Sequence, residues 1–241
     1  MKWKFSLLGP FFSSADAIRG VFGAVLLSLI GMSAAQAGVV VGGTRLIYQA
    51  ASKEGALSIN NPEKTTPYLI QSWVDNFQET DSNKVPFIIT PPLFRLDAGQ
   101  ENVLRIVYTG NNLPQDRESI FWLNLKSIPA TVASQSNQLQ ITVKTRIKLI
   151  YRPAGLSESP ETAYQKLVFS RQGGRLTAHN PTPFYVSFYA LSVNGKDVDN
   201  PGMVAPGQDS SWSAPANAGG KVTWSAINDF GGISASASGV L

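Results

Sequence analysis

Short runs of β-branched and alternating apolar residues recur along this 241-residue chain, separated by Pro, Gly and Asn. This punctuation constrains the fold more than any other feature of the sequence. After residue 37, no long segment repeats its apolar residues at helical spacing. Many short strands separated by turn residues are typical of β-sandwiches and barrels. The sequence therefore predicts an all-β protein.

Two groups of predicted strands lie on either side of the segment Arg152-Pro153-Ala154-Gly155, where Pro and Gly predict a hinge. The first group has seven strands, the number expected of an immunoglobulin-like sandwich. In the second group, Asn194-Gly195 is a strong hairpin-turn signal. The predicted strands are residues 45–49, 56–60, 68–74, 86–90, 102–108, 119–128 and 138–151, then 166–170, 175–179, 185–193, 210–213, 221–226 and 234–240.

The first 37 residues have the pattern of an export signal. Lys2 and Lys4 precede an apolar run at residues 21–31, and Ala35-Gln36-Ala37 matches an A-x-A cleavage site. The run is far shorter than the roughly 20 apolar residues that a spanning helix needs. We therefore predict residues 1–37 as a cleaved signal peptide, 38–152 as a first domain and 153–241 as a second.

Composition argues against several kinds of chemistry. The chain has no Cys and one His, which removes thiol nucleophiles, Cys-based metal sites and sites with two histidines. Removing the leader leaves 17 basic and 15 acidic residues with no Lys/Arg cluster, so the charge does not indicate nucleic-acid binding. The sequence contains no GxxxxGK[ST] motif, which would indicate nucleotide binding. We expect no metal and no cofactor.

One predicted strand is unusually long. Residues 138–152 read QLQITVKTRIKLIYR, with apolar and polar residues in alternation. Typical strands have about 5–6 residues. A long exposed edge invites pairing with another chain. The small polar segment at 132–137 predicts a loop from which this strand emerges.

Five motifs, in order along the chain, resemble those of periplasmic pilus-assembly chaperones of the chaperone–usher pathway. Together they extend over nearly all of the predicted mature chain. They are Thr90-Pro-Pro92 with Phe94-Arg-Leu96, LPQDRESIFWLNLKSIP at 113–129, TRIKLIYRP at 145–153, NPTP at 180–183 and INDFGG at 227–232.

The resemblance implies two immunoglobulin-like β-sandwich domains in a boomerang arrangement with a cleft between them. It also implies a periplasmic protein that binds, folds and caps pilus subunits by donor-strand complementation and delivers them to an outer-membrane usher. Donating a strand in this way is a known form of β-augmentation. The short loop at 132–137 resembles the short-loop subgroup. The sequence leaves open whether the free protein caps its own edge by dimerising.

The resemblance also implies roles for particular residues. Arg45 and Lys148 match the pair that binds the C-terminal carboxylate of the pilin, and Leu139, Ile141 and Val143 are the apolar anchors of the donor strand. Two cations suit a carboxylate, which Arg can bind through two hydrogen bonds.

Two further groups of residues match family positions. Glu118, Arg152 and Asp229 match an inter-domain ion network, whose expected purpose is to fix domain orientation. Thr90, Pro91 and Pro92 match a turn that contributes to usher docking. The motif also suits a rigid turn with a cis bond.

Strand parity raises a geometric problem. Lys148 lies at an even position, whereas Leu139, Ile141 and Val143 lie at odd positions, and alternate residues of a strand point to opposite faces. We therefore predict a bulge, bend or strong twist between Val143 and Lys148.

Two other functions compete with the chaperone hypothesis. Glu118, Asp116 and Asp229 could supply a carboxylate pair for glycoside hydrolysis, although nothing in their spacing requires it. A secreted β-sandwich pilin or adhesin is the second alternative. Pilins usually carry a disulfide and an N-terminal donor extension, and this chain has no Cys and predicted strands soon after Gly38.

Overall fold

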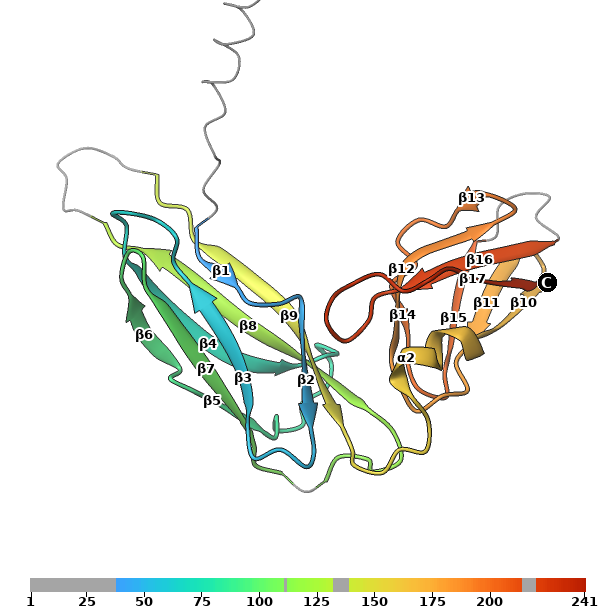
Figure 1. Cartoon of the computed structure of the whole chain (residues 1–241), viewed down its shortest axis with the longest axis horizontal. Helices are drawn as coiled ribbons and strands as arrows, with labels where there is room; N and C mark the ends of the chain where they lie inside the picture. Colours follow the sequence, from blue (N-terminus) through green and yellow to red (C-terminus); the bar gives the residue numbers. More distant parts are fainter. Residues whose placement is uncertain (1–37, 111, 132–138, 214–219) are drawn as a thin grey trace, which may run out of the picture. The chain divides into compact units, whose positions relative to one another are not determined.

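The computed structural model describes residues 38–110, 112–131, 139–213 and 220–241. Residues 38–241 form one unit, in which the strands build two β-sandwiches one after the other along the chain (Figure 1). The predicted signal peptide at 1–37 and the predicted loop at 132–137 lie outside the described residues. No described helix is both long and apolar enough to cross a membrane.

The first sandwich packs a four-stranded sheet, in the order β1-β3-β7-β5, against a five-stranded sheet, in the order β2-β9-β8-β4-β6. Between the sheets lies a core that includes Ile59, Leu104 and Leu123, all fully buried. The strands are β1 (Val40–Val41), β2 (Arg45–Gln49), β3 (Gly55–Asn60), β4 (Tyr68–Asn76), β5 (Phe87–Thr90), β6 (Leu93–Leu96), β7 (Glu101–Tyr108), β8 (Ser119–Pro129) and β9 (Val143–Arg152).

The N-terminal strand of this sandwich is divided between its two sheets. β1 pairs antiparallel with β3, and after Gly42 and Gly43 the chain enters β2, which pairs parallel with β9. A Cβ on Gly42 would clash with the Ser58 hydroxyl and lie 3.1 Å from the Ser58 carbonyl oxygen, so this close approach favours glycine. The crossing places Arg45, at the start of β2, beside β9.

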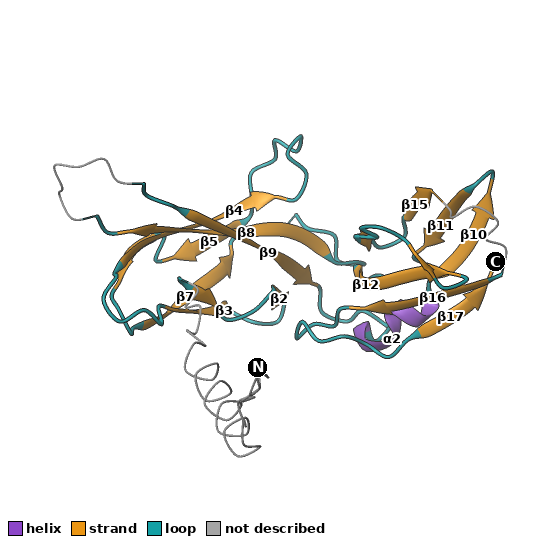
Figure 2. Ribbon diagram, turned by 90° about the horizontal axis from the view of Figure 1, so that it is seen from above, coloured by secondary structure: helices purple, strands orange, loops and turns teal. Residues whose placement is uncertain are grey.

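The second sandwich has its own core, which includes Leu176, Leu191 and Trp224. Its sheets are β10-β11-β15 and β13-β12-β16-β17, with β14 paired to β12. Figure 2 shows a short helix, α2, beside the strands of this sandwich. The elements are α2 (Pro160–Ala163), the 3-10 turn η1 (Tyr164–Lys166), β10 (Val168–Gln172), β11 (Arg175–His179), β12 (Val186–Val193), β13 (Lys196–Asp197), β14 (Met203–Val204), β15 (Asp209–Ser213), β16 (Lys221–Ala226) and β17 (Ala237–Val240).

Most predicted strands correspond to observed ones within a few residues. The strands at 45–49, 175–179 and 221–226 are exact, and Asn194-Gly195 forms the turn between β12 and β13, with both residues at positive φ. The short strands β1, β6, β13 and β14 and the helix α2 were not predicted. They have two to four residues each, which is too short for a periodic pattern to be recognised.

The prediction for the long strand was wrong at its N-terminal end. β9 begins at Val143 rather than Gln138, so Leu139 and Ile141 precede the strand and are exposed. The β8–β9 ladder ends at the pair Ser127–Val143, and upstream of it the Gln140 side chain donates to the Pro129 carbonyl. Alternation favours an extended chain, but a strand also needs a paired neighbour.

Of the bulge, bend or strong twist predicted between Val143 and Lys148, the bulge is absent. The β8–β9 register runs without a shift from Ser127–Val143 to Ser119–Tyr151. Ile147, Leu149 and Tyr151 face the core. Lys148 therefore lies on the outer face of the sheet, opposite to these three side chains.

The core of the first sandwich should depend strongly on its central leucines. Leu123→Ala empties a fully buried site in β8 and should lower the free energy of unfolding by about 2–5 kcal/mol. Leu69→Ala in the neighbouring β4 removes an exposed leucine and should cost less than about 1 kcal/mol. Chemical denaturation measures both, and equal losses would contradict this account of the core.

Candidate functional site: the β9 edge and its two cations

The outer edge of β9 is only partly covered. β2 pairs with it from Lys148 to Arg152. Between Val143 and Ile147, no strand in the described part of the chain pairs with this edge, since β8 occupies the other side. Backbone donors and acceptors are therefore available to a further strand along this stretch.

Arg45 and Lys148 lie where the covered part of the edge begins. They are direct partners in the parallel β2–β9 ladder. Both side chains reach residues of the second sandwich: Arg45 Nη1 donates to the Ile227 carbonyl at 3.0 Å, and Lys148 Nζ donates to Ser187 Oγ at 2.9 Å. The fold thus brings together the two cations that the resemblance pairs.

A pocket of about 440 Å³ opens beside these two cations. Trp122, Arg146 and Ile147 of the first sandwich line it, and so do Tyr189 and Ile233 of the second. Arg45 Nε is buried and has no hydrogen-bond partner. A buried donor without a partner costs free energy.

Burial disfavours both positive charges. Burial, together with the positive charge of the neighbouring Arg45, lowers the pKa of Lys148 to about 8. Burial also lowers the pKa of Arg45, although the carboxylates of Asp229 and Glu118 oppose the shift. Two partly buried like charges favour an anion between them.

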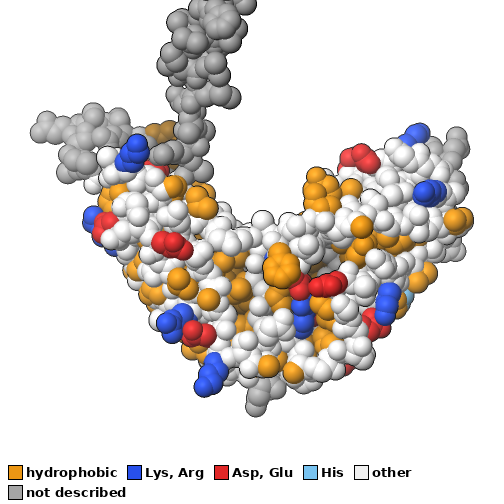
Figure 3. Space-filling view, viewed as in Figure 1, with side chains coloured by type: hydrophobic (Ala, Val, Ile, Leu, Met, Phe, Trp, Pro, Cys, Tyr) orange, Lys and Arg blue, Asp and Glu red, His pale blue; other side chains and the backbone are white. Residues whose placement is uncertain are grey.

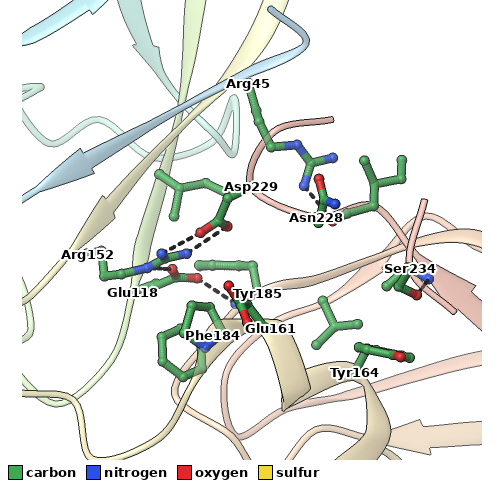
Figure 4. Close-up of a pocket in the computed structure, with 15 residues that line it drawn as sticks. Arg45, Glu118, Arg152, Glu161, Tyr164, Phe184, Tyr185, Asn228, Asp229 and Ser234 are labelled. Carbon is green, nitrogen blue, oxygen red and sulfur yellow. Dashed lines mark hydrogen bonds and ion pairs between the residues drawn. The ribbon is translucent and has the colours of Figure 1, made fainter. Parts of the chain in front are cut away.

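The residues of the predicted ion network are in direct contact. Arg152 Nε donates to Glu118 Oε1 at 2.6 Å, and its Nη1 and Nη2 donate to the two carboxylate oxygens of Asp229 at 2.6 and 2.9 Å (Figure 4). Glu118 Oε2 accepts the backbone amide of Tyr185 at 2.7 Å. Arg152 therefore joins a carboxylate of the first sandwich to one of the second. Figure 3 shows acidic and basic side chains side by side near the middle of the molecular face.

Burial and pairing act in opposite directions on these groups. Burial raises the pKa of Glu118, while Arg152 and the Tyr185 amide oppose the shift. Burial disfavours the charged form of Arg152, but the interactions of Arg152 with Asp229 and Glu118 outweigh this effect and raise the pKa of Arg152. Both oxygens of Glu118 and both of Asp229 are engaged in hydrogen bonds within the protein, and Asp116 pairs with Arg117.

Sequence reasoning missed the aromatic partners of β9. Arg146 lies 5.3 Å above the ring of Trp122 and donates to Asn124 Oδ1, and Lys144 lies 5.0 Å from the ring of Trp73. The two tryptophans are half-buried on the outer face rather than in the core. Lys144 and Arg146 are thus held against β4 and β8 by cation–π contacts. The sequence showed the alternation but not the neighbouring strand.

Thr90, Pro91 and Pro92 connect the two sheets of the first sandwich, far along the chain from the cations. The Thr90–Pro91 bond is cis, and the Pro91 carbonyl accepts the Ser72 hydroxyl. Thr90 and Pro92 are exposed. The predicted usher contact here stays a prediction.

Models of two protein domains match this chain in succession. The first, described as the pili and flagellar-assembly chaperone, PapD N-terminal domain, matches residues 38–157. The second, described as the pili assembly chaperone PapD, C-terminal domain, matches residues 162–238. The chain therefore belongs to the PapD-like pilus-assembly chaperones, and each of its two sandwiches has the fold of that family.

Individual relatives agree. The probable fimbrial chaperone LpfB of Escherichia coli O157:H7 is 44% identical over 219 residues, which cover 89% of this chain and 94% of LpfB. The chaperone protein FimC of Escherichia coli K12 is 42% identical over 210 residues, 86% of each chain. Among solved structures, the Salmonella enterica SafA pilin–SafB chaperone complex matches with a TM-score of 0.78 and 35% identity, covering 87% of this chain and 99% of the matched chain.

The ion network predicts strong coupling between its members. Arg152→Ala leaves Glu118, 3% exposed, without its cation and should lower the free energy of unfolding by about 3–5 kcal/mol. Adding Glu118→Gln should recover part of that loss because the unpaired charge is then gone. Chemical denaturation of the single and double variants measures the coupling.

The exposed pair Arg95–Asp97 provides the control. Its N–O distance is also 2.6 Å, but both side chains are about half exposed or more, so Asp97→Ala should cost less than about 1 kcal/mol. A comparable loss of unfolding free energy in Arg152→Ala and Asp97→Ala would show that burial does not set the contribution of the network to stability.

Proposed function

We propose that this protein is a periplasmic chaperone that lends the free edge of β9 to a pilus subunit and binds the C-terminal carboxylate of that pilin with Arg45 and Lys148. One observation carries the proposal: the unpaired edge of β9 ends at these two cations. The chain's similarity to a chaperone solved together with a pilin supports the class of partner. Binding and folding energy suffice for this work, without a cofactor or catalysis.

The direction of the incoming strand follows from β2. β2 runs parallel to β9 and begins at Arg45. A strand that continues this edge upstream in the same direction ends with its C-terminus against Arg45 and Lys148. A strand in the opposite direction would present an ammonium group to two cations, which is unfavourable. The site therefore selects a parallel strand that terminates at the pair.

Because the register of β9 is unbroken, one partner can contact side chains on both faces of β9. The new strand would pair through its backbone, so alternate side chains of β9 point to opposite sides of the extended sheet. Leu139, Ile141 and Val143 are exposed upstream of the first sandwich's core, where they can fill the hydrophobic core of a pilin that lacks a strand. Three such side chains contribute about 5–9 kcal/mol before the costs of association. Lys148 meets the terminus from the other face.

The leader, the ion network and the turn at residues 90–92 also have roles in this proposed function. Cleavage after Ala37 would release one mature chain into the periplasm. Its two domains, residues 38–152 and 153–241, would be held in their relative orientation by the Glu118–Arg152–Asp229 network. The exposed turn at Thr90, Pro91 and Pro92 would contact the outer-membrane usher that receives the pilin.

Removing either cation should abolish capture of the pilin. The chain is co-expressed with candidate pilus subunits, and the pilin that co-purifies is quantified. Arg45→Ala and Lys148→Ala should each reduce recovery at least tenfold, because a desolvated charge pair loses one partner. Arg95→Ala removes an exposed cation elsewhere and should leave recovery unchanged. Wild-type recovery with both alanine variants would exclude the carboxylate site.

Capture should also depend on pH through Lys148. With a pKa of about 8, Lys148 is mostly charged at pH 7, and only about one molecule in ten is charged at pH 9. A bound carboxylate favours the charged form and raises the pKa, so binding takes up a proton between about pH 8 and 10 and weakens as the pH rises through 8. Titration calorimetry of a peptide with the C-terminal sequence of a pilin, in buffers of different ionisation enthalpy, measures the uptake.

Lys148→Arg is the matched variant, because arginine stays charged throughout this range. It should bind with little change between pH 7 and 9. An equal pH dependence in wild type and Lys148→Arg would assign the titration to another group.

A further inference from the structure

An apolar rim of three exposed side chains on the second sandwich borders the pocket of Arg45 and Lys148. The rim consists of Tyr189, Phe230 and Ile233, which are 58%, 94% and 54% exposed. Tyr189 and Ile233 line the pocket itself, and Phe230 adjoins Gly231, which also lines it. Exposed hydrophobic residues gathered in one place mark interaction sites more often than isolated ones.

Phe230 is held outward by an ordered loop. Asn228 Oδ1 accepts the backbone amides of Phe230 at 3.1 Å and Gly232 at 2.8 Å, and the Asn228 amide donates to the Gly232 carbonyl. Gly231, at φ 82°, completes the turn. The adjacent Asp229 is anchored by Arg152. The ring is therefore presented to solvent on a backbone that loses little further entropy on binding.

A different feature of the backbone, a β-bulge, directs Tyr189 outward. The β12–β16 register shifts between Phe188 and Ala190, so Tyr189 is the extra residue of a β-bulge. Bulges re-aim a side chain and interrupt pairing, and they are common near functional sites. Phe188 on one side of the bulge is buried, whereas Tyr189 is exposed at the pocket.

We propose that the rim of Tyr189, Phe230 and Ile233 is a second contact for the bound pilin, which packs an apolar surface against it next to its C-terminal strand. The inference rests on the proposed function, because it takes the occupant of the neighbouring pocket to be the pilin. Continuity supports this choice, since a chain that ends between Arg45 and Lys148 lies in a pocket that Tyr189 and Ile233 also line. Ordered aromatic side chains are also typical of residues that dominate binding energy.

A competition between two chaperones tests the rim. Wild-type chain with one tag and a variant with another are co-expressed with a limiting amount of a pilin that the wild-type chain captures, and the pilin recovered on each tag is measured. Phe230→Ser should lose to wild type about tenfold, and Phe230→Ser combined with Tyr189→Ser about a hundredfold. Val168→Ser and Val240→Ser remove exposed apolar side chains of the same sandwich away from the pocket and should compete equally.

The outcomes separate the rim from the carboxylate site. Equal competition by the rim variants, while Arg45→Ala still fails to capture the pilin, overturns the rim alone. Capture that survives both Arg45→Ala and Lys148→Ala overturns the carboxylate site of the proposed function. Thermal melting of the free variants is measured in parallel, and a large loss there would assign the effect to folding and overturn the rim. Rim variants that change only the self-association of the free chain in sedimentation would identify a second copy as the occupant, against the proposal.

Discussion

The contact on which the rest of the structure depends is the bond between Arg152 and its two carboxylates. Arg152 ends β9, the strand with the open edge, and its guanidinium contacts Glu118 of the same sandwich and Asp229 of the other. Transferring a charge from water into the protein interior is costly, and only full pairing with good geometry compensates for this cost. The network therefore has one favourable arrangement, in which the loop that carries Asp229 is anchored at the end of β9.

This anchoring links the ion network to the two cations, Arg45 and Lys148. The Ile227 carbonyl, which accepts from Arg45, lies two residues before Asp229, and Ser187, which accepts from Lys148, lies in the strand after Tyr185, whose amide binds Glu118. The same few segments of the second sandwich thus support both groups. Under the proposed function, the network positions Arg45 and Lys148, both of which line the pocket.

The candidate site could be predicted only in part. Motif order pointed to Arg45, Lys148, Glu118, Arg152 and Asp229, and the structure brings each group together. The length of β9, the register from Val143 to Lys148, and the partners Ser187 and Ile227 could not be predicted. A periodic pattern describes one strand, whereas pairing depends on a neighbour that is distant in sequence. For the same reason, the strand pattern did not show that Trp73 and Trp122 lie beneath Lys144 and Arg146 on the outer face.

The sequence by itself determined the all-β class, most strand positions and the tight turn at Asn194-Gly195, because alternation and turn residues act over a few neighbouring residues. Tertiary structure alone decided where β9 becomes an open edge, which of its faces carries the cations, and that Tyr189 and Phe230 are held outward beside them. Those features arise from ladder register, a β-bulge and a buried ion pair between residues that are far apart in the chain. Such contacts form only when the whole chain has folded.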